Sequence, residues 1–211
     1  AERLLRRFVQ QHRYLGLNTQ WPFTLEAFRQ LHPDAEIDMG SIERFAMWLS
    51  PTSRDREMVV DSAPHLLSML HALAGPGTLD NIRAEYRDLP ELGSRAGTRL
   101  NFVYAHAHGT TNVEFSLARR LEQPRPAGYS VNGFGAQRHV ALPEYLISFI
   151  GNGKKVPVRD PLASAVEDFI HAVNTGRQPN RTSVVDGMTQ LLQLVAATSE
   201  GEPYEKKSSD S

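Results

Sequence analysis

Asp61 and His65 are four residues apart, where the sequence predicts the start of a helix. An imidazole titrates near neutral pH and can take a proton from a substrate hydroxyl or return it. A nearby carboxylate can orient the ring and favour its charged form. The pair therefore indicates acid–base chemistry on a hydroxyl group. The structural alternative is that a histidine in a first helical turn is a cap or a surface residue.

The helix predicted to carry this pair has signals at both ends. Asp61 or Ser62 can accept a hydrogen bond from a first-turn N–H, and Pro64 fits there because those donors have no intrahelical partner. An apolar stripe follows at helical spacing: Leu66, Met69, Leu70 and Leu73. Residues 75–77, Gly-Pro-Gly, are expected to end the element.

A second pair of histidines, His106 and His108, is predicted to project from one side of a strand, and this makes a zinc site conceivable. The chain has no cysteine and no evident third ligand, so a polar sheet face is the simpler interpretation and no metal is predicted. The lack of cysteine also excludes a disulfide framework and a cysteine nucleophile. Because no strand-turn-helix nucleophile elbow is present, a hydrolase is not favoured.

Composition narrows the class of partner. The 211 residues include 23 Lys and Arg against 24 Asp and Glu, so the net charge of -1 gives no electrostatic footprint for nucleic acid or an anionic membrane. No apolar run is long enough to span a bilayer, and residues 1–11 are charged rather than signal-like. These features predict a soluble protein, and the lack of cysteine fits a cytoplasmic location.

The predicted elements change along the chain from helical to extended and back to helical. Before residue 50 we expect a helix over 2–12, a short strand over 14–17, a helix over 25–31 capped by Thr24, and a strand within 36–49. Strands are then expected over 80–89, 98–108, 111–121, 128–132 and 138–142. Two helices follow, one begun by Asp160-Pro161 and one opened by Ser183 or Asp186.

This order predicts an α+β fold. A Gly109-Thr110 turn between two of the strands indicates antiparallel neighbours. We expect an open, mainly antiparallel sheet with helices on one face. The helix and strand before residue 18 look like half of a βαβ unit, because no strand precedes them.

Several segments together resemble the Gfo/Idh/MocA oxidoreductases, a family that includes glucose-fructose oxidoreductase and inositol dehydrogenase. The stretch 169–179, FIHAVNTGRQP, then Asp186-Gly187 and an apolar helix leading to 201–204, resembles the end of that family. Residues 123–129 and Asn132-Gly133 look like its central sheet, and Asp61 with His65 matches its Asp-x-x-x-His pair. The resemblance covers nearly the whole chain.

The resemblance implies a division into domains. Residues 1–20 would be the remnant of an N-terminal Rossmann domain, 21–204 the substrate-binding and oligomerisation domain, and 205–211 a flexible tail. The family's Gly-rich phosphate loop and its Glu-Lys-Pro lysine have no counterpart here. NAD or NADP would therefore belong to a complete protein, and neither is expected to bind tightly to this chain alone. A separate Rossmann-domain polypeptide is one way in which the cofactor-binding half could be supplied. Whether this chain is itself an enzyme stays open.

The resemblance also implies roles for individual residues. His65 would transfer the proton, with Asp61 positioning it. Asn18 and Gln20 would contact the cofactor, and Trp21 would contact the substrate with His65. One departure concerns Ser68, which stands where many members carry a second carboxylate.

Two functions follow from these expectations. The first is the substrate-binding and oligomerisation part of a nicotinamide-dependent oxidoreductase acting on a sugar, cyclitol or related polyol. The alternative is a non-catalytic binding or assembly module that lacks the cofactor domain. For it, Phe102 and Phe115 would make the open sheet face a homo-oligomer surface.

Overall fold

A nine-stranded sheet organises the part of the chain that the computed structural model describes. That part is residues 18–35, 42–89, 94–177, 184–199 and 202–203, with isolated positions before residue 18. The strand order is β8-β7-β6-β5-β1-β4-β3-β2-β9. The strands are Arg44–Leu49 (β1), Gly77–Leu89 (β2), Ser94–His106 (β3), Gly109–Ala118 (β4), Gly128–Val131 (β5), Phe134–Ala141 (β6), Leu146–Gly151 (β7), Lys154–Pro157 (β8) and Glu202–Pro203 (β9). Only the pairs β1–β4 and β2–β9 are parallel within these residues.

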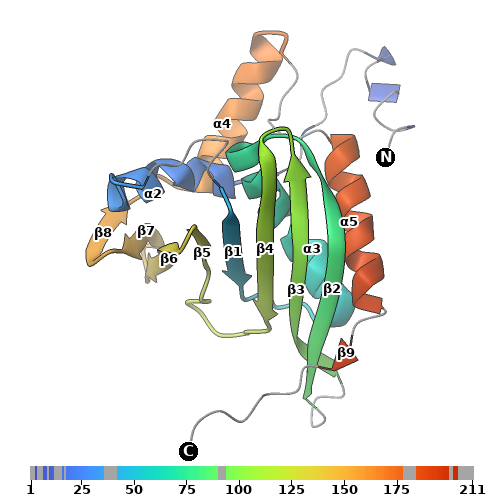
Figure 1. Cartoon of the computed structure of the whole chain (residues 1–211). Helices are drawn as coiled ribbons and strands as arrows, with labels where there is room; N and C mark the ends of the chain where they lie inside the picture. Colours follow the sequence, from blue (N-terminus) through green and yellow to red (C-terminus); the bar gives the residue numbers. More distant parts are fainter. Residues whose placement is uncertain are drawn as a thin grey trace, which may run out of the picture.

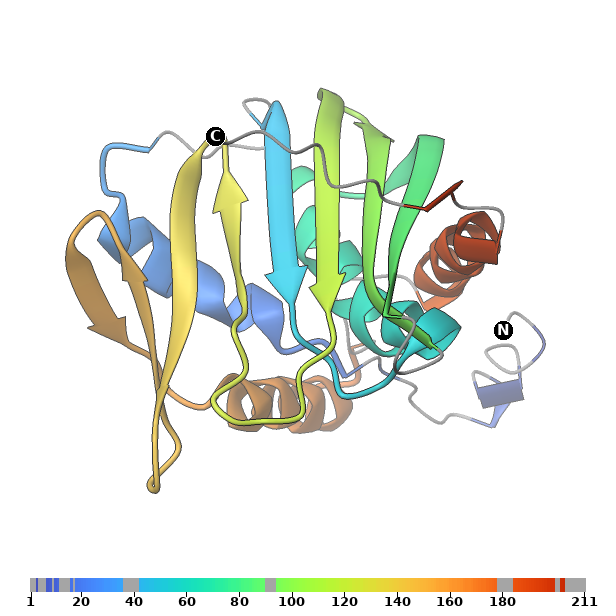
Figure 2. The same ribbon diagram turned by 90° about the horizontal axis from the view of Figure 1, so that it is seen from below.

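The helices described in the structure all lie on one face of this sheet, and the opposite face carries none of them (Figures 1 and 2). They are the 3-10 helix Trp21–Thr24 (η1), Leu25–Leu31 (α2), Asp55–Ala74 (α3), Pro161–Asn174 (α4) and Val184–Ser199 (α5). The expected α+β fold, with an open and mainly antiparallel sheet, is confirmed. None of these helices is long and apolar enough to cross a membrane.

Alternation along the central strands places the core between the sheet and the helices. Leu100, Phe102 and Tyr104 of β3 are buried, as are Phe115 and Leu117 of β4. Side chains two residues apart lie on the same face of a strand, so these residues face the helices. The expectation that Phe102 and Phe115 form an exposed surface is therefore wrong.

The predicted start of the central helix is also wrong. α3 begins at Asp55, not at Asp61 or Ser62, and Pro64 lies inside it. Met58 and Val59 are fully buried and continue the apolar stripe toward the N-terminus, so packing stabilises more than one further turn. His65 is consequently in the middle of the helix.

Other boundaries differ less. The strand expected within 36–49 begins at Arg44, and residues 36–41 lie outside the described residues. Thr24 does not cap α2, because its hydroxyl bonds the Trp21 carbonyl and the Tyr129 hydroxyl. α4 follows its prediction: the Asp160 carboxylate accepts a hydrogen bond from the Leu162 amide. Most of the helix and strand expected before residue 18, and the tail 205–211, lie outside the described residues.

Strands β7 and β8 were not predicted. Asn152 and Gly153 between them have φ values of 49° and 68°, the conformation of a two-residue hairpin turn. Phe149 of β7 is buried against the helix side, so this hairpin extends the core as well as the sheet.

Gly128 in β5 is required by close packing, and this gives a stability prediction. A Cβ there would lie 2.4 Å from the Trp48 ring and 2.6 Å from the Ala136 carbonyl oxygen. Gly128→Ala should lower the free energy of unfolding by about 2 kcal/mol, measured by urea denaturation. Gly135→Ala in the next strand is the matched control, since a Cβ there meets nothing within 4 Å. Equal losses in the two variants would contradict this account.

Candidate functional site

His65 lines a pocket of about 290 Å³ between the middle of α3 and the sheet. The walls come from η1 and the residue before it, the segment after β1, the loop before β5, and strand β6. The lining residues are Gln20, Trp21, Leu49, Ser50, Pro51, Thr52, Asp61, Ser62, His65, Arg125, Ala127, Arg138 and Tyr145. Ligand pockets begin at roughly 300 Å³, so this one suits a compound with a single ring.

The His65 imidazole is half-buried and is held neutral. Burial lowers its pKa to about 4, and the positive charge of Arg138 adds to this effect. Its Nδ1 atom is buried and has no hydrogen-bond partner among the described residues. A neutral imidazole with an unpartnered nitrogen can accept a proton, although its lowered pKa makes it a weak base while the pocket is empty.

Arg138 is the charged neighbour of His65, and it is fixed by the sheet. Its amide donates a 2.8 Å hydrogen bond to the Ala127 carbonyl, and its Nη2 donates one of 3.1 Å to the Arg125 carbonyl. The guanidinium lies 5.9 Å from the centre of the Trp21 ring, a cation–π distance. Its Nε has no hydrogen-bond partner in the part of the chain described.

Sequence reasoning missed Arg138, Arg125 and Tyr145. Arg138 lies two residues from the buried Ala136 and two from the buried Val140, so all three side chains project from the same face of β6, the one that faces the helices. An arginine on the buried face of a strand could have indicated a binding site. The expected strand began at residue 138, whereas β6 begins at Phe134, so the alternation that places Arg138 on the buried face was not recognised. Arg125 and Tyr145 are in loops and had no local signal.

The structure brings three of the other expected site residues to this pocket. Asp61 and His65 are one helical turn apart and share a face of α3. Asp61 is exposed at the rim, and no hydrogen bond or ion pair joins it to His65 among the described residues. Gln20 and the buried Trp21 line the pocket, whereas Asn18 is exposed and does not.

Ser68 is one turn beyond His65 but does not face the pocket. It is buried, and its hydroxyl donates a 2.8 Å hydrogen bond to the His65 carbonyl. The hydroxyl is therefore satisfied within the helix.

The His106 and His108 rings are 6.3 Å apart at the β3–β4 turn. His106 Nε2 lies 3.3 Å from the Thr111 hydroxyl. Among the described residues there is no group of three side chains able to hold a metal ion.

The lowered pKa of His65 predicts a pH-dependent stability. The unfolded chain binds this proton with a pKa near 6.5 and the folded chain with one of about 4. The stabilisation is therefore complete above pH 6.5 and is lost as pH falls toward 4, by roughly 3 kcal/mol at most. His65→Gln should lose less stability than the unaltered chain between about pH 7 and pH 4.5, measured by urea unfolding.

His171→Gln, at an exposed position on α4, is the control and should keep the profile of the unaltered chain. If His65→Gln shows the same loss as the unaltered chain, the imidazole is not held neutral.

Comparison with known proteins shows similarity of fold at low sequence identity. No protein-family model and no curated protein matches the chain. Among solved structures, the UDP-N-acetylglucosamine 3-dehydrogenase GnnA from Acidithiobacillus ferrooxidans is 18% identical, with a TM-score of 0.61. The match covers 93% of this chain and 65% of that one.

Two further structures agree. The dehydrogenase MviM from Clostridium difficile is 10% identical with a TM-score of 0.59, over 93% of this chain and 66% of its own. A mutant of KijD10, a 3-ketoreductase from Actinomadura kijaniata in complex with TDP-benzene and NADP, is 17% identical with a TM-score of 0.59. That match covers 97% of this chain and 67% of the KijD10 chain. This chain thus spans about 65% of the length of the first structures it matches, and it shares its fold with part of these dehydrogenase structures, in line with the resemblance to the Gfo/Idh/MocA oxidoreductases.

Proposed function

We propose that this chain is the substrate-binding part of a nicotinamide-dependent oxidoreductase that acts on a sugar, cyclitol or related hydroxylated compound. The observation that carries the proposal is the neutral imidazole of His65, with its unpartnered Nδ1, in a pocket of ring size. The fold shared with dehydrogenases supports it.

His65 would accept the proton of the reacting hydroxyl when the substrate is oxidised and return it in the reverse direction. Asp61, at the rim on the same helix face, would position the imidazole or the substrate. Trp21 would give the sugar ring an apolar wall, since it is buried and lines the pocket. Together these residues bind, orient and deprotonate the substrate.

The described residues could contact only the nicotinamide ring of the cofactor, which is the part that meets the substrate. The nicotinamide supplies hydride transfer when it is bound. Gln20 lines the pocket and Asn18 lies two residues before it, so these two side chains would contact the nicotinamide end. No Gly-rich turn joins a parallel strand to a helix within the described residues, so the diphosphate would be held elsewhere. We therefore propose that a cofactor domain, on the same or another polypeptide, completes the site.

Helix α4 gives that domain a place to dock. It extends beyond the sheet at the top of Figure 1, and among the described elements it contacts η1, which carries Trp21. Four of its apolar side chains are exposed: Leu162, Val166, Phe169 and Ile170. A third of the length of the matched structures has no counterpart in this chain. A cofactor domain seated on this stripe would bury it and lie beside the His65 pocket.

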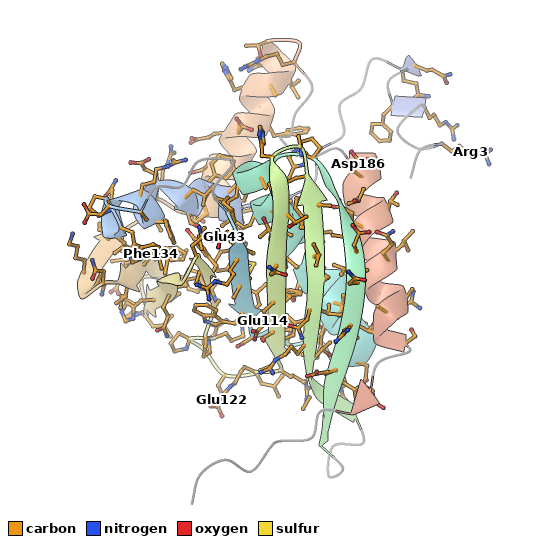
Figure 3. The ribbon with its side chains drawn as sticks, in the orientation of Figure 1. Arg3, Glu43, Glu114, Glu122, Phe134 and Asp186 are labelled. Carbon is orange, nitrogen blue, oxygen red and sulfur yellow. The ribbon has the colours of Figure 1, made fainter. Side chains whose placement is uncertain are left out.

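The open face of the sheet is our proposed surface for homo-oligomerisation. A hollow of about 680 Å³ lies on it, and Glu114 projects there from β4 (Figure 3). The face is polar: Arg99 and Glu114 form an exposed ion pair of 3.5 Å. The alternative function, a non-catalytic assembly module, assumed an apolar contact on this face. Because the face is polar, that assumption no longer supports the alternative. A stable oligomer with no dinucleotide affinity in the complete protein would restore that alternative.

The catalytic assignment of His65 predicts a large loss of turnover. In a protein that carries this chain with its cofactor domain, His65→Ala should reduce kcat roughly 100- to 10,000-fold, followed by nicotinamide absorbance, because the base is removed. The circular dichroism spectrum should not change. His108→Ala is the control and should keep full activity. Unchanged turnover in His65→Ala would remove the catalytic role.

The docking role of α4 predicts a separation of stability from cofactor binding. Val166 is 50% exposed, so Val166→Asp should change the unfolding free energy of this chain by less than about 0.5 kcal/mol. The same change should weaken dinucleotide binding to the complete protein by about tenfold or more, because it places a charge in an apolar contact. Asp168→Asn, on the same helix, should not affect binding. Equal dinucleotide affinity in all three proteins would exclude α4 from the contact.

A further inference from the structure

The charges around the His65 pocket are unbalanced. Two arginines line it, Arg125 and Arg138, against a single carboxylate, Asp61. No ion pair joins either arginine to an acidic side chain among the described residues. The chain as a whole is close to neutral, so this local excess of positive charge belongs to the pocket and not to the composition.

We propose that this pocket binds a substrate that carries an anionic group, and that Arg138 and Arg125 hold that group beside the hydroxyl that faces His65. The identity of the bound molecule as a substrate rests on the proposed function. The anion site itself stands on the two arginines and can be tested without turnover.

Arg138 is the stronger of the two indications. Its guanidinium is half-buried, and a buried charge without a counter-charge is unfavourable. Of its donors, Nη2 is used by the Arg125 carbonyl, whereas Nε has no partner in the described part of the chain. A carboxylate or phosphate oxygen would satisfy Nε and supply the missing charge in one contact.

Arg125 adds a second positive charge close to the first. Burial lowers the pKa of Arg138, and the charge of Arg125 lowers it further, whereas the Tyr145 side chain acts in the opposite direction. The two like charges repel each other. The loop of Arg125 is nevertheless tied to Arg138 through its own carbonyl. An anion between the two side chains would offset that repulsion.

Asp61 does not fill this role. It is exposed at the rim of the pocket, on the α3 side, and forms no ion pair with either arginine among the described residues. The acidic group that complements Arg138 is therefore best supplied by a ligand.

The anion would also act on the base. Arg138 is one of the two causes that lower the pKa of His65. A bound anion would cancel that charge, so the pKa of His65 would rise toward neutrality and the imidazole would become a better proton acceptor. The charged groups around this ring are Arg138, Arg125 and Asp61, with Tyr145 at the rim. Binding of the correct substrate would thus strengthen the base that acts on it.

The pocket volume limits the ligand to a ring-sized compound with the anionic group attached to it. Two sources share this chemistry, a sugar acid with a carboxylate and a sugar with a phosphate. D-glucuronate and D-glucose 1-phosphate are suitable probes for the two, and D-glucose is their neutral counterpart. Inorganic phosphate and acetate test the anion site without a ring.

The experiment is a titration of this chain with the five probes by NMR. We expect at least one of D-glucuronate and D-glucose 1-phosphate to bind about tenfold or more tightly than D-glucose, and to raise the pKa of His65. Arg138→Gln should abolish the preference, and Arg125→Gln should reduce it. Arg83→Gln removes the same charge from an exposed position on β2 and should leave the preference intact. If Arg138→Gln does not fold, the Arg125→Gln variant carries the test.

The outcomes separate the two sources and the two proposals. Preference for D-glucuronate alone identifies a carboxylate, and preference for D-glucose 1-phosphate alone identifies a phosphate. D-glucose bound as tightly as both, or no anionic probe bound at all, overturns the anion site and leaves the oxidoreductase proposal standing. An anion preference that depends on Arg138, with full turnover in His65→Ala, would support the anion site and overturn the catalytic role of His65.

Discussion

The aromatic contacts around Tyr129 are the interaction on which the site depends. The Trp21 ring meets Tyr129 and Phe149 edge-on at 6.1 Å and 6.0 Å, and Phe28 stacks on Tyr129 at 5.5 Å. Burial raises the pKa of the Tyr129 hydroxyl, which is hydrogen-bonded to Thr24. These contacts join η1 and α2 to β5 and β7 and fix one wall of the pocket. Without them Trp21 would have no defined position beside Arg138.

A second constraint is the balance between burial and charge at His65 and Arg138. Each group is partly withdrawn from water and each lowers the stability of the other's charged form. The imidazole resolves this by losing its proton, whereas a guanidinium stays charged. The result is a neutral imidazole next to a permanent cation, an arrangement that keeps the imidazole unprotonated and attracts negative charge.

The sequence predicted most of the fold but only part of the site. The strands β3 and β4 and the helix α4 had clear alternation, spacing or capping signals, because each has one buried face. The start of α3 was misplaced because Asp61, Ser62 and Pro64 imitate a helix start, whereas burial of Met58 and Val59 outweighs that local signal. Gln20, Trp21, Asp61 and His65 were predicted, from a resemblance or from spacing. Arg138 was missed because its neighbours in the pocket come from distant segments that only the folded sheet brings together.

The proposed proton acceptor and the cationic group belong to different elements, His65 to α3 and Arg138 to β6. The register of Arg138 with Phe149 sets its position independently of the helix. A substitution at residue 138 can therefore alter which compounds the pocket accepts without moving the imidazole, although loss of the Arg138 charge would raise the pKa of His65. If the proposed function holds, substrate preference is an evolvable property of one strand, while the helix keeps the imidazole in place.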